Sequence, residues 1–416
     1  MSYLLGVVLF ALAILISVSL HEAGHMLTAK MFGMKVTKFF VGFGPTIWSF
    51  KRGETEYGLK GIPLGGFCKI VGMTPQDDDV EPGDEPRVMW RYPVWKRTIV
   101  MAAGSITHFA LALVTIWILA VSAGLPNPDF PTTEAQARQE PAVIELRSCV
   151  VPENVVRECT PADPVSPAAQ AQLRDGDRIT SINGSPVGTY GELLTKLRGL
   201  KAGETARIEY VRDGQPGSAS TVLAQTQRPP LDNPGGAVGP VAALGIVVAP
   251  STPRRLTYGP VGAFGATADF TGQLAVGTAQ ALQRIPQKVP ALWTALTGGE
   301  RDVDTPISVV GASRLGGEAV QNNAWLVFFM LFVSLNFFIG VFNLLPLLPV
   351  DGGHIAVAWF ERARSWLYAR IGRADPGRVD YLKLMPFTYA VILIGGAFTL
   401  LTIAADVVNP ITLFSR

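Results

Sequence analysis

The chain has 416 residues, of which 48% are hydrophobic and only 16% are charged. This composition is too apolar for an ordinary soluble enzyme of this length, and it favours a protein that is embedded in a lipid bilayer. The formal net charge is only +2, and no basic cluster is interleaved with aromatic residues, so the composition excludes a nucleic-acid partner.

The apolar residues crowd at the two ends of the chain, and the first long apolar stretch is long enough to span a membrane. The start of the chain carries no positive charge, which argues against a cleaved signal peptide. Further apolar segments are each flanked by charged residues or by Pro and Gly. The pattern predicts four transmembrane helices, at about residues 3–29, 98–124, 324–346 and 387–408.

Lysine and arginine residues gather in the loop between the first two predicted spans and in the loop between the last two. Positively charged loops face the cytoplasm, so the polar middle third is predicted to be extracytoplasmic. A linker over 231–320 contains apolar residues at helical spacing over 272–297, interrupted by Pro286 and Pro290. We interpret 272–297 as a helix that lies on the membrane surface.

The inner end of the first span contains the sequence His21-Glu22-Ala23-Gly24-His25. Two histidines four residues apart on a helix can converge on one Zn²⁺, and the glutamate after the first can reach a water on the metal. So short a pattern also arises by chance, and the alternative is a histidine pair bonded to neighbouring backbone. Each ionisable group within a span costs at least ~2.5 kcal/mol unless it has a partner, which favours the metal site.

Catalytic zinc sites usually have three protein ligands and keep the fourth position for water. Asp351 is the candidate third ligand, because it follows the third span at the membrane side where the first span ends. Gly352 and Gly353 after it permit close backbone approach. The alternative is an aspartate in an ordinary turn.

Three motifs resemble the site-2 protease family of intramembrane zinc metalloproteases, and most of all its bacterial members with one PDZ domain. They are the His-Glu-His sequence, the segment NLLPLLPVDGGH at 343–354, and the pair GFGP at 42–45 and PLGGF at 63–67. The pair resembles the family's membrane-associated β loop, here 36–72. Val350 stands where the family usually has leucine, which leaves the presumed ligand intact.

The resemblance implies that His21, His25 and Asp351 bind Zn²⁺ and that Glu22 is the general acid/base. Zinc lowers the pKa of its water toward about 7, and the glutamate passes the proton of that water to the leaving amine. The resemblance also implies that Asn343 binds the substrate, although a buried hydrogen bond between helices is a nearly equal alternative for that residue.

A transmembrane substrate must unwind before cleavage, since a helix hides its backbone carbonyls. The unwound chain is expected to add to a strand edge in residues 39–72, where apolar residues alternate among glycines. These are Phe39, Phe40, Val41, Tyr57, Leu59 and Ile62. The resemblance implies regulated intramembrane proteolysis of single-span proteins such as anti-sigma factors. Two other functions are the alternatives to this one. A metal transporter would need metal ligands along a path through several spans, whereas the candidate ligands here gather at one depth. A PDZ scaffold with an inactive protease domain would lack the water-activating acid, yet Glu22 is present.

Two further histidines are interpreted as structural. His354 follows Asp351 by three residues and is expected to face solvent in a turn, with support of the metal ligand as the alternative. His108, in the second span, is expected to contact another helix.

The segment SPAAQAQLRDGDRITSING at 166–184 resembles the core of a bacterial PDZ domain, which we place at 140–230. A helix over 190–200 and strands over 206–211 and 221–225 complete the pattern. PDZ domains bind extended peptides by strand addition, so peptide or ectodomain binding is expected, with a plug that blocks entry as the alternative. Cys149 and Cys159 lie in this insert and can pair if it faces an oxidising compartment.

The predicted fold class is therefore an α-helical polytopic membrane protein with a membrane-associated β loop, plus an extracytoplasmic α+β PDZ domain. The membrane halves are 1–125 and 321–416, in the cell membrane, with the active site near its cytoplasmic side.

Overall fold

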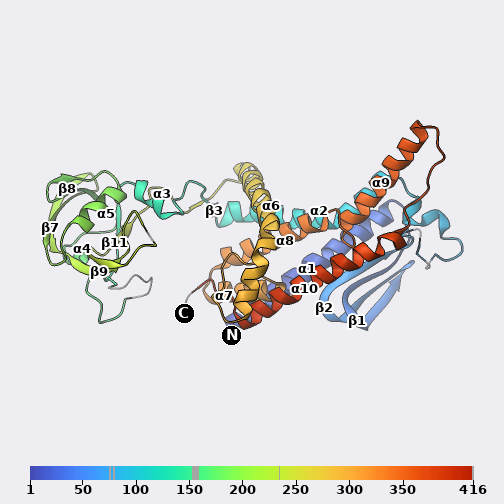
Figure 1. Ribbon diagram of the computed structural model, residues 1–416, viewed down its shortest axis with the longest axis horizontal. Coiled ribbons are helices and arrows are strands. Elements are labelled where there is room, and N and C mark those ends of the chain that lie inside the picture. Colours follow the sequence, from blue (N-terminus) through green and yellow to red (C-terminus); the bar gives the residue numbers. More distant parts are fainter. Residues whose placement is uncertain (75, 78–79, 152–158, 234, 415–416) are drawn as a thin grey trace. The chain divides into compact units, whose positions relative to one another are not determined.

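The computed structural model describes residues 1–74, 76–77, 80–151, 159–233 and 235–414 (Figure 1). Part of the expected PDZ range, residues 152–158, therefore lies outside the described residues. The chain forms two compact units, one made of Met1–Gly124 with Thr257–Arg416 and the other of Leu125–Leu256. The second unit extends beyond the range 140–230 expected for the PDZ domain on both sides.

Four helical stretches of the first unit are long and apolar enough to cross a membrane, within the part of the chain that the structure describes. They are α1 (Ser2–Met31), α2 (Val94–Ser122), α8 (Trp325–Asn343), and η3 (Tyr381–Leu384) continued by α10 (Met385–Val408). Many of their large apolar side chains are exposed, as expected of helices that face lipid. The chain is thus a polytopic membrane protein with the four spans that its sequence predicts.

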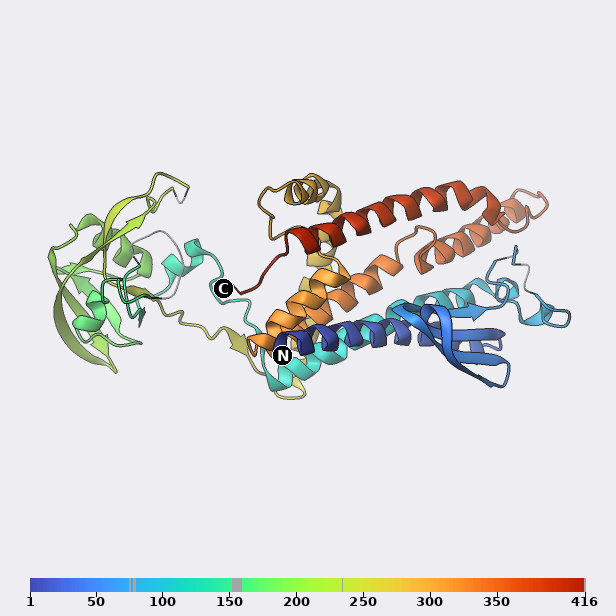
Figure 2. The same ribbon diagram turned by 90° about the horizontal axis from the view of Figure 1, so that it is seen from below.

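The helices of the first unit pack around α1 and α2. α1 contacts α2 and α7 (Val309–Gln321), while α2 also contacts α8 and α9 (Asp351–Arg370), as Figure 2 shows for α1 and α2. Gly24 allows α1 to approach α2 closely, because a Cβ there would lie 2.7 Å from the carbonyl oxygen of Ala103. This close approach brings the side chains of α1 against α2 at the level of the histidine pair.

The β loop is a long hairpin of β1 (Val36–Arg52) and β2 (Thr55–Ile70), which lies beside the C-terminal half of α1 (Figure 2). Phe39 lies opposite Cys68 on one side and Tyr57 on the other, and residues 38–41 all pair on both sides, so they run through the middle of a curled sheet. The expectation of a strand edge within residues 39–72 therefore holds for its last part only, since 39–41 and 57–59 lie inside the sheet. The outer stretches are 46–52 and 62–70, because the hairpin curls until both ends of β2 pair with the start of β1.

The segments expected to be loop or linker are more helical than the sequence suggested. Asp351 begins α9, a 20-residue helix, and α6 (Gly262–Leu296) begins ten residues before the expected start at 272. Pro286 and Pro290 lie inside α6 without ending it. Proline can stay in a helix because its fixed φ is helical, at the loss of a backbone hydrogen bond. The helix lies against α2, α8 and α10, so neighbouring helices support it.

The second unit is an α+β fold around a four-stranded antiparallel sheet in the order β6-β5-β7-β8. The strands of this sheet are β5 (Arg178–Ile182), β6 (Ser185–Pro186), β7 (Thr205–Arg212) and β8 (Gln215–Val222). The second predicted strand, 221–225, is instead divided between β8 and β9. The Asn183-Gly184 turn has both residues at positive φ, as such a hairpin turn requires.

Helices α4 (Pro167–Gln170) and α5 (Tyr190–Gly199) contact this sheet. The helix expected over 190–200 is α5, whose buried Leu193 and Leu197 pack with Ile179 and Ile208 in one core. Cys149 and Cys159 form a disulfide. The other elements of the unit are α3 (Glu134–Gln139), β3 (Leu125–Pro126), β4 (Ile144–Leu146), β9 (Ala224–Arg228), β10 (Gly239–Ala243), β11 (Ile246–Val248) and β12 (Arg255–Leu256).

Candidate metal centre

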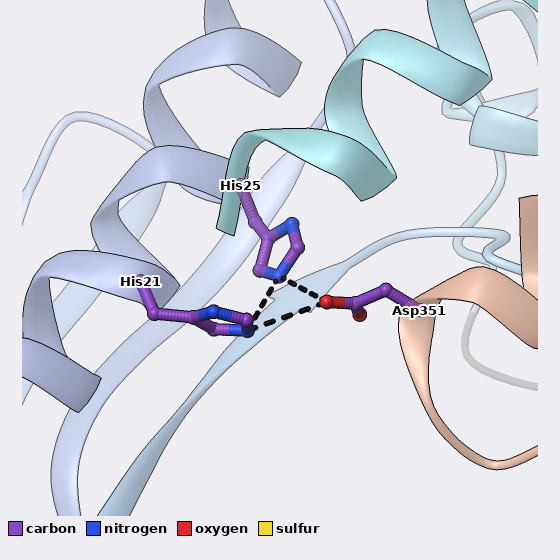
Figure 3. A group of neighbouring side chains, drawn as sticks. All are labelled: His21, His25 and Asp351. Carbon is purple, nitrogen blue, oxygen red and sulfur yellow. Dashed lines mark hydrogen bonds and ion pairs between the residues drawn. The ribbon is translucent and has the colours of Figure 1, made fainter. Parts of the chain in front are cut away.

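Three side chains from two helices meet at one point in the first unit (Figure 3). His21 and His25 lie one turn apart on α1, and Asp351 is the first residue of α9. The Oδ2 atom of Asp351 lies 3.4 Å from Nε2 of His21 and 3.4 Å from Nε2 of His25. The two Nε2 atoms lie 3.1 Å apart. The structure thus brings together the three residues that the sequence suggested as metal ligands.

The spacing of these donor atoms fits one zinc ion. Ligands at about 2.0–2.1 Å from a tetrahedral zinc lie about 3.3 Å from one another, which matches the three observed separations. The Oδ2 atom of Asp351 is buried and has no hydrogen bond from the described residues. A buried carboxylate oxygen that points at two imidazole nitrogens is what a metal ligand requires, and it would be costly without a partner.

Helix α2 holds both imidazoles in place. The Nδ1 atom of His25 lies 2.7 Å from the carbonyl oxygen of Val100, so its Nδ1–H donates to that oxygen. This bond leaves Nε2 unprotonated and free to bind a metal. Four residues further along α2, a Cβ on Gly104 would lie 2.4–2.6 Å from ring atoms of His21. Only glycine at position 104 leaves room for that ring.

Asp351 reaches the centre because the first turn of α9 packs tightly on the segment before it. A Cβ on Gly352 would lie 2.3 Å from the carbonyl of Leu344, and one on Gly353 would lie 2.6 Å from the Leu347 carbonyl carbon. The close backbone approach expected of these glycines is therefore confirmed. Burial raises the pKa of the Asp351 carboxyl, yet the two imidazoles outweigh it and hold that pKa below its ordinary value.

Glu22 lies beside the three candidate ligands but is not one of them. Its carboxylate interacts with His25, His21 and Asp351 and with the backbone of Cys68 in β2. A Cβ on Gly66 would lie 3.4 Å from Cγ of Glu22. Glu22 therefore lies between the metal centre and the outer stretch 62–70 of the hairpin.

The other candidate residues lie around this centre. Asn343 is the last residue of α8, half-buried, and its side chain makes no hydrogen bond to another described residue, so the interhelical bond is not seen. The expectation that His354 faces solvent is wrong, because α9 packs against α2 and the ring meets Tyr381. The His354 ring is half-buried, stacks on Tyr381 at 5.8 Å and lines a small cavity beside Arg97.

His108 makes the helix contact expected of it. It is 1% exposed and bonds to Ser17 of α1 and to Asn336 of α8. Sequence reasoning missed these two partners. Of the two, only Ser17 offered a signal, since it stands four residues before His21 on the same face of α1.

The sequence profile of peptidase family M50 matches residues 9–374, a range that contains Glu22 and all three candidate ligands. The chain belongs to peptidase family M50. It is therefore a peptidase, and the resemblance to site-2 proteases is confirmed. Zinc metalloprotease Rip1 of Mycolicibacterium smegmatis is 44% identical over 418 residues, covering 100% of both chains. Zinc metalloprotease Rip1 of Mycobacterium tuberculosis is 44% identical over 419 residues, again covering 100% of both.

Among solved structures, the chain is similar to the PDZ domain of an SdrC-like protein from Listeria monocytogenes. The similarity has a TM-score of 0.16 and 23% identity, and it covers 25% of this chain and 85% of that one.

Proposed function

We propose that this peptidase is an intramembrane zinc metalloendopeptidase that cleaves the transmembrane segments of single-span proteins. His21, His25 and Asp351 hold the Zn²⁺, and Glu22 is the general acid/base. The observation that carries the proposal is the trio of donor atoms, 3.1–3.4 Å apart, beside a carboxylate on a membrane-spanning helix. The two relatives named as zinc metalloproteases, which match the whole chain, support the choice of metal.

Zinc in such a site supplies Lewis acidity and makes the attack of water on a peptide carbonyl feasible near neutral pH. Glu22 accepts the proton of the attacking water and delivers it to the leaving amine nitrogen. Its position next to the ligand His21 and against β2 suits both transfers. The hydrogen bond from His25 to the Val100 carbonyl keeps the imidazole in its metal-binding orientation, so the ring does not have to move during the reaction.

The substrate is bound in extended form along the outer stretch 62–70 of β2. Two observations support this binding mode: the stretch pairs with β1 on one side only among the described strands, and Glu22 contacts it. Strand addition gives main-chain hydrogen bonds that replace those of the unwound helix. Asn343 has a side-chain amide without a partner among the described residues and donates to the extended substrate.

The hairpin and α9 face the cytoplasm, and the second unit is extracytoplasmic. The lysines and arginines of the two loops favour this orientation. The Cys149–Cys159 disulfide supports an oxidising compartment for the second unit. That unit is a PDZ domain which binds peptides or substrate ectodomains by strand addition, and the substrates include anti-sigma-factor-like proteins.

The test is cleavage of a tagged single-span substrate in membranes, with zinc content measured on the same purified proteins. Glu22→Gln is expected to keep zinc but to lose cleavage by at least about 100-fold, as loss of general acid/base catalysis does. Asp351→Ala loses both zinc and cleavage, and a chelator abolishes cleavage by wild type. Asp375→Asn, which changes an exposed aspartate after α9, is the control and leaves both unchanged. Undiminished cleavage by Glu22→Gln contradicts the mechanism.

A further inference from the structure

A second polar cluster lies next to the metal centre, inside the helix bundle. It consists of Ser17 on α1, His108 on α2 and Asn336 on α8, whose exposed fractions are 2%, 1% and 1%. Each of these residues lies within a helix long and apolar enough to span the membrane. Polar side chains buried at such a place are costly unless they are paired, and an ionisable one such as His108 is a candidate for a functional role.

The cluster is built on the same helix faces as the metal centre. Ser17 precedes His21 by one turn of α1, and His108 follows Gly104 by one turn of α2. Gly104 is the residue whose missing side chain leaves room for the His21 ring. The His108 ring lies against that ring, with centroids 5.0 Å apart. His21 thus lies between the other two candidate ligands, His25 and Asp351, on one side and this cluster on the other.

The hydrogen bonds of the cluster assign the proton on His108. The amide nitrogen of Asn336 donates to the carbonyl oxygen of Phe332 at 2.9 Å, which turns its Oδ1 toward the cluster. That Oδ1 accepts from the Ser17 hydroxyl and lies 2.9 Å from Nδ1 of His108. Since Oδ1 can only accept, Nδ1 carries the proton. The Nε2 atom of His108 is then an unprotonated acceptor.

His21 presents the complementary group. When its Nε2 binds a metal, its proton resides on Nδ1, which becomes a donor. This Nδ1 is buried and has no hydrogen-bond partner among the described residues. Two imidazoles joined by an N–H···N bond have centroids roughly 5 Å apart, because the bond of about 2.9 Å adds to the two ring radii. The observed separation of 5.0 Å is of this length.

We propose that His108, held by Asn336 and Ser17, is a positioning residue that accepts a hydrogen bond from Nδ1 of the zinc ligand His21. The inference rests on the proposed zinc centre. His25 has the backbone carbonyl of Val100 for the same purpose, and His108 gives His21 the equivalent support. Outer partners of this kind fix the ring and the tautomer of a metal-binding histidine, and their loss typically weakens metal binding 10- to 100-fold.

The test measures zinc release from the purified full-length protein to a chelating dye, together with the absorption spectrum of the cobalt-loaded form. His108→Leu and Asn336→Leu are expected to release zinc about 10-fold faster or more and to shift the cobalt bands. His108→Gln, which keeps an acceptor near the Nε2 position, restores slow release. Ser17→Ala has a smaller effect of the same sign, whereas its matched control Ser105→Ala, another buried serine, has none, because Ser105 bonds to no described residue.

The outcomes separate this inference from the zinc centre itself. Wild-type protein that binds no zinc overturns both. Stoichiometric zinc that is lost in His25→Ala, but released at the wild-type rate from folded His108→Leu, overturns only the role of His108. Faster release from His108→Leu that His108→Gln does not restore also contradicts the proposed acceptor and leaves His108 with a packing role.

Discussion

Arg97 of α2 and Glu361 of α9 form a buried ion pair, with Nη1 of the arginine 3.1 Å from Oε2 of the glutamate and side chains that are 4% and 5% exposed. The same carboxylate binds Arg378 at 3.1 Å and accepts from the backbone of Val379 at 2.9 Å. Because α9 begins at Asp351, this pair fastens the helix that carries the third ligand onto α2, which contacts the rings of both histidines of α1.

Removing one partner of this pair is expected to destabilise the protein. Glu361→Gln leaves the Arg97 guanidinium buried without its countercharge, and breaking such a pair costs about 3–5 kcal/mol. Zinc affinity falls as well, since Asp351 is no longer held against the histidines. Thermal unfolding of the detergent-solubilised protein and its zinc content measure the two effects.

The matched control for Glu361→Gln is Asp302→Asn, which breaks the Lys288–Asp302 pair, where the side chains are 23% and 42% exposed. An exposed pair contributes at most about 1 kcal/mol, so this variant is expected to unfold close to wild type. Similar unfolding of Glu361→Gln and Asp302→Asn would show that the buried pair does not hold α9.

Gly104→Ala is expected to expel zinc, because its Cβ would meet the His21 ring at 2.4–2.6 Å. Neither the ring nor the backbone of α2 can move freely, since Gly24 packs on Ala103 in the same contact. Zinc content and cleavage are the readouts. Gly395→Ala in α10 is the control, as its Cβ meets nothing within 4 Å, and it keeps zinc with unchanged or slightly raised stability. Full zinc occupancy in Gly104→Ala would contradict the observed packing.

Much of the metal centre follows from local sequence. The spacing of His21 and His25 places both rings on one face of a helix whatever the rest of the chain does. The four spans are also predictable from local sequence, since the thickness of the bilayer sets the length of the apolar stretch that each one needs. Asp351 is predictable as the third ligand from the membrane topology, because the end of the first span and the end of the third lie at the same side of the membrane and so at the same depth.

The rest depends on contacts between residues far apart in the sequence. Ser17 and Asn336 are separated by 319 positions, and no local pattern links them. The curl of the hairpin, which places residues 39–41 and 57–59 inside the sheet and leaves 62–70 at its edge, results from both ends of β2 pairing with one stretch of β1. The helix α9 was missed because its sequence is rich in arginine and reads as a charged loop, whereas the pairing of Glu361 with Arg97 supplies its docking.

Removal of the Cys149–Cys159 disulfide is expected to loosen the second unit selectively. The bond closes a loop with a sequence separation of 10, and a loop of that size contributes about 2–3 kcal/mol. In the full-length double variant Cys149→Ser, Cys159→Ser, core amides of the second unit should exchange with solvent faster, while those of α1 and α2 do not change. Uniform exchange rates in wild type and variant would mean that the bond adds no stability there.

Cys68 should be nearly inert toward alkylating reagents in the folded protein. Burial, with a smaller contribution from the Glu22 carboxylate, raises the pKa of its thiol from 9.0 to about 12. The difference, 12 − 9 = 3, leaves about 1000-fold less thiolate than in the unfolded chain at any pH below 9, and only the thiolate reacts. Reaction with iodoacetamide at pH 8 should therefore be about 1000-fold slower in the native protein than in denaturing detergent, and it should accelerate about tenfold per pH unit.

The variant Glu22→Gln provides the internal comparison for Cys68, because it removes the repulsion by the carboxylate and leaves the burial. Its Cys68 should react faster than that of wild type, but still far more slowly than in the denatured chain. Without reductant, Cys149 and Cys159 are bonded to each other and do not contribute to the signal. Equal reactivity of Cys68 in wild type and Glu22→Gln would contradict the placement of the catalytic acid against β2, on which the proposed transfer of protons depends.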